Sequence, residues 1–373
     1  MKSILNLINV FFFTHYFESK SIRILTTSLC FVLSFQFPNF ELNTNPKENK
    51  LKILFGSCLH QDRPSPILET VAKETPDYFF LLGDNIYFDT ENAEEKRSAY
   101  VKLDENPFWK ALTNISKIRS TWDDHDFGIN DSGGEYSDKV KSRELYVEYL
   151  AKHHPKNIQL GKQNKEGIYF SEGIVWKGKS IGFVFLDTRF FRSPLKRTIA
   201  SYFLRRKHYR ENEDPQATIL GEDQWVWLKD VLEKKYDLLL LVSSIQVLAT
   251  GHPFEKWQNF PKERERLFEL LESSNAKEVL ILSGDRHIAE IYQLQIGKKT
   301  LTEITSSSLN LPLKHLPLEY SSEFKIGKSF DLENFGRVTL TESDEGVGFV
   351  AEILDQNANV VLSVSNPKAE KRE

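Results

Sequence analysis

Short apolar runs of strand length recur along the chain from residue 51 onward. They occupy residues 51–55, 78–82, 181–186, 238–242 and 279–282. Patterns with helical periodicity lie between several of them, at 66–74, 224–235 and 263–272. Because strands and helices alternate, the sequence predicts an α/β domain. From about Leu301 apolar and polar residues alternate, which predicts further strands at the end of the domain.

The N-terminal part of the chain has a different pattern. Two apolar runs, at 4–13 and 24–37, precede a polar stretch, and Lys20 and Arg23 stand just before the second run. This order is typical of a signal peptide or a short membrane anchor. We therefore predict a signal peptide or anchor at 1–42, a polar linker at 43–50 and the folded domain at 51–373. The protein is expected to be exported to the periplasm or the extracellular space, or held at a membrane by this segment.

Composition narrows the classes of partner. The 49 Lys and Arg are balanced by 53 Asp and Glu, which gives a net charge of -4. No basic face dominates, so binding to nucleic acid through phosphate neutralisation is not expected. An anionic substrate must then be held locally, by metal ions or by a few arginines. The two cysteines, Cys30 and Cys58, do not provide a disulfide framework.

Chemistry-bearing residues follow the apolar runs. The four strongest motifs are Gly-Ser-Cys at 56–58, Gly-Asp-Asn-Ile-Tyr at 83–87, Trp-Asp-Asp-His-Asp at 122–126 and Gly-Asp-Arg-His at 284–287. In open α/β sheets the ligand crevice lies outside the carboxyl ends of the strands, so these side chains are expected to meet at one place. Together the motifs predict a metal cluster.

The donor types suggest which ions are bound. The carboxylate of Asp84 can bridge two cations, while Tyr87 offers a phenolate and Cys58 a thiolate, a set that suits trivalent iron. Other carboxylates suit a divalent ion such as calcium or manganese. Three carboxylates within 123–126 repel one another unless cations or donors neutralise them. Taken singly, Asp84 and Asp285 also fit turn residues and Tyr87 a core aromatic residue.

Arg189 follows the apolar run at 181–186 and lies two residues after Asp187. Its guanidinium can donate two parallel hydrogen bonds to a phosphate, which a lysine cannot do. The alternative is a surface ion pair. The surrounding segment, 188–214, is rich in Arg, Lys and aromatic residues and is expected to be a surface excursion near the site.

These motifs, with Leu-Asp-Thr-Arg at 186–189, Gly-Glu-Asp-Gln-Trp at 221–225 and Ser-Ser-Ile-Gln at 243–246, resemble the alkaline phosphatase D (PhoD-like) family of metallophosphatases. The resemblance extends over about 51–362. It implies a four-layer α/β/β/α sandwich and hydrolysis of phosphate monoesters or diesters by metal-activated water. It also implies Fe3+ and Ca2+ as the metals, with other divalent cations such as Mn2+ as substitutes.

The resemblance assigns roles residue by residue. The expected iron ligands are Cys58, Asp84 and Tyr87, with Asp84 bridging, and the expected ligands of the other metal are Asp124, Asp285 and His287. The expected catalytic residues are His125, Arg189 and Asp123, with His125 as the acid or phosphate-contacting histidine and Arg189 holding phosphate.

Two alternatives stay open. One is a phosphodiesterase or phospholipase D-type activity on the same scaffold, because the metal core does not indicate whether the ester carries one organic group or two. The other is a non-enzymatic surface protein that retains the metal site for binding. The sequence leaves the natural substrate and the oligomeric state undetermined.

Overall fold

The structure, a computed structural model, describes residues 50–150, 152–153, 166–199, 201, 208–314, 322–343 and 346–366. The predicted leader at 1–42 and nearly all of the predicted linker at 43–50 lie outside these residues. Among the helices that are described, none is long and apolar enough to cross a membrane.

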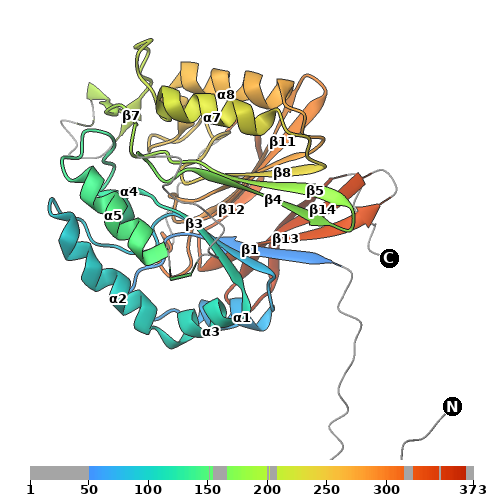
Figure 1. The fold of residues 1–373 in the computed structure, drawn as a ribbon, viewed down its shortest axis with the longest axis horizontal. Coiled ribbons are helices and arrows are strands. Elements are labelled where there is room, and N and C mark those ends of the chain that lie inside the picture. Colours follow the sequence, from blue (N-terminus) through green and yellow to red (C-terminus); the bar gives the residue numbers. More distant parts are fainter. Residues whose placement is uncertain are drawn as a thin grey trace, which may run out of the picture. The chain divides into compact units, whose positions relative to one another are not determined.

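Two sheets form the centre of the domain (Figure 1). The first has six strands in the order β15-β14-β13-β1-β2-β3. Their bounds are β1 Leu51–Gly56, β2 Tyr78–Leu82, β3 Lys117–Thr121, β13 Asn334–Ser343, β14 Gly346–Asp355 and β15 Val360–Ser365. Strands β1, β2 and β3 are parallel, and β13 to β15 add an antiparallel half.

The second sheet has seven strands in the order β12-β10-β11-β9-β8-β5-β4. Their bounds are β4 Phe170–Trp176, β5 Lys179–Phe185, β8 Leu238–Ser243, β9 Val279–Ser283, β10 Ala289–Ile296, β11 Lys299–Ser306 and β12 Lys325–Phe330. Strands β5, β8, β9 and β11 are parallel neighbours. A separate two-stranded pair is formed by β6 Lys196–Arg197 and β7 Tyr209–Arg210.

Helices cover the outer faces of both sheets (Figure 1). Against the first sheet pack α1 Ile67–Lys73, α2 Arg97–Glu105, α3 Pro107–Ile115 and α5 Lys139–Leu150, and against the second pack α7 Gly221–Leu232 and α8 Pro261–Ser273. The short elements are η1 Ala93–Lys96, α4 Asp124–Phe127 and η2 Trp257–Asn259. The start of α3 illustrates the local cause: Asn106 caps the backbone N–H groups of Phe108 and Trp109, and Pro107 occupies the first helical position.

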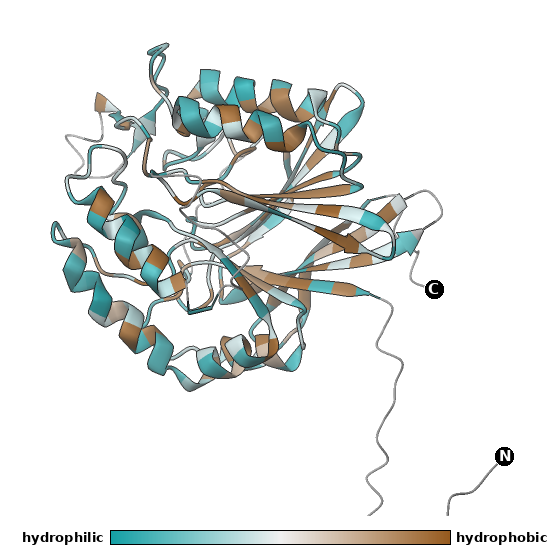
Figure 2. Ribbon diagram, in the orientation of Figure 1, coloured by the Kyte–Doolittle hydropathy of each residue, from teal (hydrophilic) through white to brown (hydrophobic). Residues whose placement is uncertain are grey.

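Alternation along the strands builds three core layers. In β2, Tyr78, Phe80 and Leu82 face the second sheet, whereas Phe79 and Leu81 face the helices. Figure 2 shows the resulting concentration of apolar residues in the strands of both sheets. Because side chains in a strand alternate between faces, strands buried on both sides must be apolar throughout. The predicted four-layer α/β/β/α sandwich is the observed architecture.

Most predicted elements are present. The runs at 78–82, 238–242 and 279–282 coincide with β2, β8 and β9 to within one residue, and the helical pattern at 66–74 corresponds to α1. Helix α7 begins at Gly221, earlier than the predicted 224, because Glu222 and Asp223 occupy its first turn, where negative charge is favourable. The strands expected after Leu301 are β11 to β15.

One expectation about the surface is wrong. Only part of the segment 188–214 can be a surface excursion, because Thr188, Arg189 and Arg192 at its start are fully buried. Its start therefore belongs to the interior beside the carboxyl end of β5, where buried carboxylates compensate the two arginine charges.

Candidate metal centre

All the candidate site residues lie just beyond the carboxyl ends of parallel strands. Cys58 follows β1, Asp84 follows β2, Asp123 and Asp124 follow β3, Arg189 follows β5, and Asp285 and His287 follow β9. The parallel strands of both sheets thus direct these loops toward one region. This is the position at which α/β sheets commonly bind ligands.

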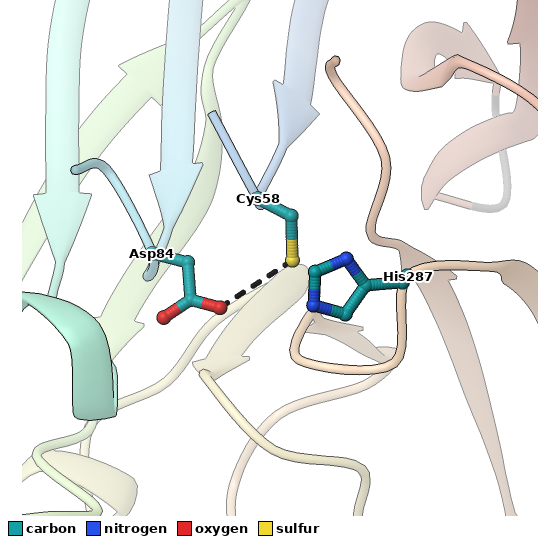
Figure 3. Close-up of side chains that lie close together, drawn as sticks. All are labelled: Cys58, Asp84 and His287. Atoms are coloured by element: carbon teal, nitrogen blue, oxygen red, sulfur yellow. Dashed lines mark hydrogen bonds between the residues drawn. The ribbon is translucent and has the colours of Figure 1, made fainter. Parts of the chain in front are cut away.

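Cys58, Asp84 and His287 form one group of potential metal ligands, with one ligand atom of each within 4.8 Å of the others. Figure 3 shows the three side chains converging from separate loops, with the Cys58 thiol 3.5 Å from Asp84 Oδ2. The hydroxyl of Tyr87 donates to the same Asp84 oxygen at 2.9 Å and lies 3.4 Å from His287 Nε2. His287 therefore shares a group with two of the predicted iron ligands, Cys58 and Asp84, and its expected binding of the other metal stays a prediction.

Two further groups adjoin the first. Asp84, Asp124 and His125 form one, and Asp123, Asp124 and Asp285 form the other, each with ligand atoms within 4.8 Å of one another. Asp84 and Asp124 are shared between groups, so the three sets form a continuous cluster. A carboxylate has two oxygens, which allows each shared residue to bridge neighbouring cations.

The backbone at these positions is unusual. Cys58, Asp84, Asp285 and His287 all have positive φ, at 57°, 52°, 68° and 56°. Positive φ is uncommon for residues other than glycine and costs free energy, so it persists where surrounding structure enforces it and is concentrated at functional sites. Gly83, with φ at 107°, has no room for a side chain, since a Cβ there would lie 2.6 Å from Asp123 Cβ.

The cluster contains more acidic side chains than the neighbouring basic side chains can neutralise. Burial raises the pKa of Cys58, Asp84 and Tyr87 well above their ordinary values, and burial together with Asp123 and Asp124 does the same for Asp285. Asp84 Oδ1 and Asp123 Oδ2 are buried without a hydrogen-bond partner. Buried acceptors without donors are rare and costly, and a bound cation would satisfy them. The residues present therefore fit a multi-cation site.

Asp124 is held by several donors. Its Oδ2 accepts hydrogen bonds from the Asp131 N–H at 2.6 Å and the Asn130 side chain at 3.3 Å. Burial alone would raise the pKa of Asp124, but the charges of His125 and Arg189 and the Asp131 N–H hold it below its ordinary value. These contacts orient the carboxylate of Asp124 and favour its ionised form.

His125 lies at the edge of the cluster. Its Nδ1 pairs with Asp89 Oδ1 at 2.6 Å, and its ring packs against Tyr87 with centroids 4.2 Å apart. Burial opposes the charged imidazolium, but Asp124, Asp84 and Asp89 raise the pKa of His125 to about 10. Its side chain is partly exposed.

Arg189, which is expected to hold phosphate, lies in the interior and is not a surface ion pair. Its guanidinium is completely buried and is engaged by two carboxylates, with Nε donating to Asp123 Oδ1 at 2.5 Å and Nη1 donating to Glu255 Oε2 at 2.7 Å. These contacts occupy Nε and Nη1, whereas the buried Nη2 has no hydrogen-bond partner, so the phosphate-holding role of Arg189 stays a prediction. Arg189 also fixes Asp123, whose Oδ1 accepts a second hydrogen bond from the Ser244 hydroxyl at 2.6 Å.

Two residues that support the site, Asp126 and Lys96, received no individual role from the sequence. Asp126 accepts hydrogen bonds from the backbone N–H groups of Asn85 and Asp123 and so joins the loops after β2 and β3. Lys96 donates to the carbonyls of His125 and Gly128 at the end of α4. Asp126 was visible within its motif as a third carboxylate, but nothing in the local sequence marks Lys96.

Comparisons with known proteins agree with this geometry. A family model described as PhoD-like phosphatase matches residues 54–316. The chain is 23% identical over 292 residues to alkaline phosphatase D of Bacillus subtilis strain 168. This match covers 68% of this chain and 49% of that protein. The chain thus spans about half the length of this curated relative.

Two solved structures share the fold. A structure titled "Structure of PhoD" is similar with a TM-score of 0.66 at 19% identity, over 86% of this chain and 70% of that chain. A dimetal phosphatase from Danio rerio is similar with a TM-score of 0.51 at 14% identity, over 86% of this chain and 99% of that one. Since the family model matches more than half of the chain, this protein belongs to the PhoD-like phosphatase family.

Proposed function

We propose that the protein is a metal-dependent hydrolase of phosphate esters. The observation that supports this most is the continuous cluster of potential ligands shared through Asp84 and Asp124, which contains buried carboxylate oxygens without partners. Bound cations would polarise phosphoryl oxygens and activate water for attack. A site built only for structural metal binding would be closed by protein ligands, whereas His125 at the edge of this cluster is partly exposed.

The donor types support a division of metals within the cluster. Cys58, Asp84 and Tyr87, with His287 beside them, supply thiolate, carboxylate, phenolate and imidazole, which suit Fe3+. Asp123, Asp124 and Asp285 supply only carboxylate oxygens, which suit Ca2+ or Mn2+. We propose this assignment, with Asp84 joining the two parts.

The roles of the protein's own groups follow from their contacts. His125, held by Asp89, is proposed to transfer a proton to or from the reacting oxygens. Asp131 and Asn130 hold Asp124, and Ser244 and Arg189 hold Asp123, so both carboxylates are fixed before substrate binds. Such preorganisation removes reorganisation from the chemical step.

The test is hydrolysis of p-nitrophenyl phosphate and bis-p-nitrophenyl phosphate by the metal-loaded full chain, with and without a chelator. Chelator-sensitive turnover of either ester supports the proposal, and the faster substrate identifies a monoesterase or a diesterase. Metal-loaded protein without turnover on either ester would favour the binding-only alternative.

Export and membrane association are a separate proposal, supported by the apolar run at 24–37 and the basic residues before it. Cell fractionation of the full chain tests it. Recovery in the cytoplasmic fraction with an intact N-terminus would contradict it.

A further inference from the structure

Glu255, in the loop before η2, lies between two arginines that come from the loop after β5. Its Oε2 accepts a hydrogen bond from Arg189 Nη1 at 2.7 Å, and its Oε1 forms an ion pair with Arg192 Nε at 3.0 Å. All three side chains are buried, with 0% to 1% of their surface exposed. Glu255 belongs to none of the three groups of potential metal ligands.

Each arginine is connected through hydrogen bonds to a different carboxylate of the cluster. Arg189 Nε donates to Asp123 Oδ1 at 2.5 Å. Arg192 Nη2 donates to the backbone carbonyl of Asp131 at 2.6 Å, and the N–H of the same Asp131 donates to Asp124 Oδ2 at 2.6 Å. The contacts therefore form a chain from Asp123 through Arg189, Glu255, Arg192 and Asp131 to Asp124. Asp123 and Asp124 are adjacent in sequence, and each is held by one end of this chain.

The loop that carries Asp131 is shaped to admit Arg192. A Cβ on Gly133 would lie 2.8 Å from the Arg192 guanidinium carbon, so only glycine allows this approach. The Gly134 N–H donates to the Arg192 carbonyl at 2.8 Å, which ties the same loop to Arg192 a second time. Arg192 is thus packed to support the Asp131 loop.

The free-energy cost of burying these charges indicates that the network does more than stabilise the fold. Burying ions is expensive, and replacing a buried ion network by apolar side chains is often neutral or stabilising. The network also leaves one oxygen of Asp123 without a donor. Asp123 Oδ1 accepts hydrogen bonds from Arg189 and Ser244, whereas Asp123 Oδ2 is buried without a partner. The oxygen left over is the one available to a cation.

We propose that Glu255 is a positioning residue that, through Arg189 and Arg192, orders Asp123 and Asp124 for metal binding. This inference rests on the proposed function only in taking the cluster as a metal centre. Groups that orient metal ligands from outside typically affect metal affinity when they are changed. Glu255 acts through the arginines and does not touch substrate.

The experiment compares the metal affinity of full-length wild type, Glu255→Gln and Glu352→Gln, measured for Mn2+ by competition with a chelator. Glu352 is a matched control because it is equally buried and is paired with an arginine, but it lies on β14 and its partner, Arg337, lies opposite it on β13. Thermal unfolding of the metal-free proteins is recorded in parallel.

For Glu255→Gln we expect a loss of Mn2+ affinity of about 10- to 100-fold, whereas Glu352→Gln should lose thermal stability and keep wild-type affinity. Wild-type affinity in a folded Glu255→Gln protein would overturn the inference. If that variant does not fold, Arg192→Lys decides: it should weaken affinity by losing the contact with Asp131, and unchanged affinity would refute the inference. Wild type that binds no metal would overturn the proposed function as well, whereas wild type that binds metal without turnover would overturn only the proposed function.

Discussion

The Tyr87 hydroxyl donates a 2.9 Å hydrogen bond to Asp84 Oδ2, and the same oxygen accepts a hydrogen bond from the Cys58 thiol at 3.5 Å. Two proton donors thus converge on one carboxylate oxygen while the other oxygen, Oδ1, has no partner. All three groups are acids whose pKa is raised well above its ordinary value, first by burial. A bound cation would reverse this preference, because it favours the ionised form of each.

Asp84→Asn should abolish hydrolysis and leave the fold intact. Asparagine tolerates the positive φ of 52° at this position, and it removes a charge that burial disfavours. Turnover should fall by at least about 1,000-fold, because metal polarisation supplies several kcal/mol to the reaction. Steady-state rates and circular dichroism check both parts, and retained turnover in a folded Asp84→Asn protein would contradict the assignment.

Tyr87→Phe should remove the phenolate-to-iron charge-transfer band from the visible spectrum of the iron-loaded protein. A phenolate bound to Fe3+ gives a charge-transfer absorption band, and phenylalanine keeps the ring against His125 without the oxygen. Tyr100→Phe, at a tyrosine buried among the helices on the first sheet, is the control and should retain the band. An unchanged spectrum in Tyr87→Phe would exclude Tyr87 as an iron ligand.

Asp89→Asn should lower kcat with little change in KM. Asp89 pairs with His125 Nδ1 at 2.6 Å and so orients the ring proposed to transfer a proton. The expected loss is about 10- to 100-fold, as for other carboxylates that orient functional histidines. Asp104→Asn breaks a similar aspartate–histidine pair, with His153 at 2.9 Å, outside the candidate centre. Equal losses in the two variants would argue against a catalytic role for the first pair.

Stability should fall on acidification partly through His252. This buried ring is in a neutral arrangement, since Nε2 lies 2.9 Å from Gln246 Oε1 and Nδ1 accepts from the Phe254 N–H. Burial, with Arg286 and Lys256, lowers the pKa of His252 well below its ordinary value. The neutral form therefore stabilises the fold above the unfolded pKa of about 6.5, and this contribution is lost as pH falls, by at most about 1.4 kcal/mol per unit.

The check compares urea unfolding of wild type and His252→Gln at about pH 7.5 and about pH 5.5, on either side of the unfolded histidine pKa. The other titrating groups are the same in both proteins, so the difference reports His252. The variant should lose less stability than wild type on acidification, and an equal loss would exclude the His252 contribution.

The fold could be predicted from the sequence where burial is complete on both sides. Strand β2 is an uninterrupted apolar run, and β8 and β9 are such runs followed by one serine, so all three could be predicted to within one residue. Helix α5 was missed because its buried face includes Ser142, Tyr146 and Tyr149 instead of a simple apolar stripe. In that helix tertiary hydrogen bonds, such as that from Ser142 to the Phe127 carbonyl, replace the usual hydrophobic signal.

The candidate site could be predicted where its residues follow strands in recognisable motifs. Cys58, Asp84 and His287 were predicted individually and lie together, although their binding of metal stays a prediction. Glu255 and Lys96 could not be found in this way. Their contacts with the site come from packing between loops that are distant in sequence, and the local pattern of residues does not record such contacts.

The most direct measurement is a metal titration of the stripped full-length protein, in which bound metal and hydrolysis of the two p-nitrophenyl esters are followed together. The account predicts no turnover without metal, and turnover that returns in step with cations bound at the cluster of Cys58, Asp84, Tyr87, Asp124, Asp285 and His287. Full activity in the stripped protein, or bound metal without turnover of either ester, would contradict it.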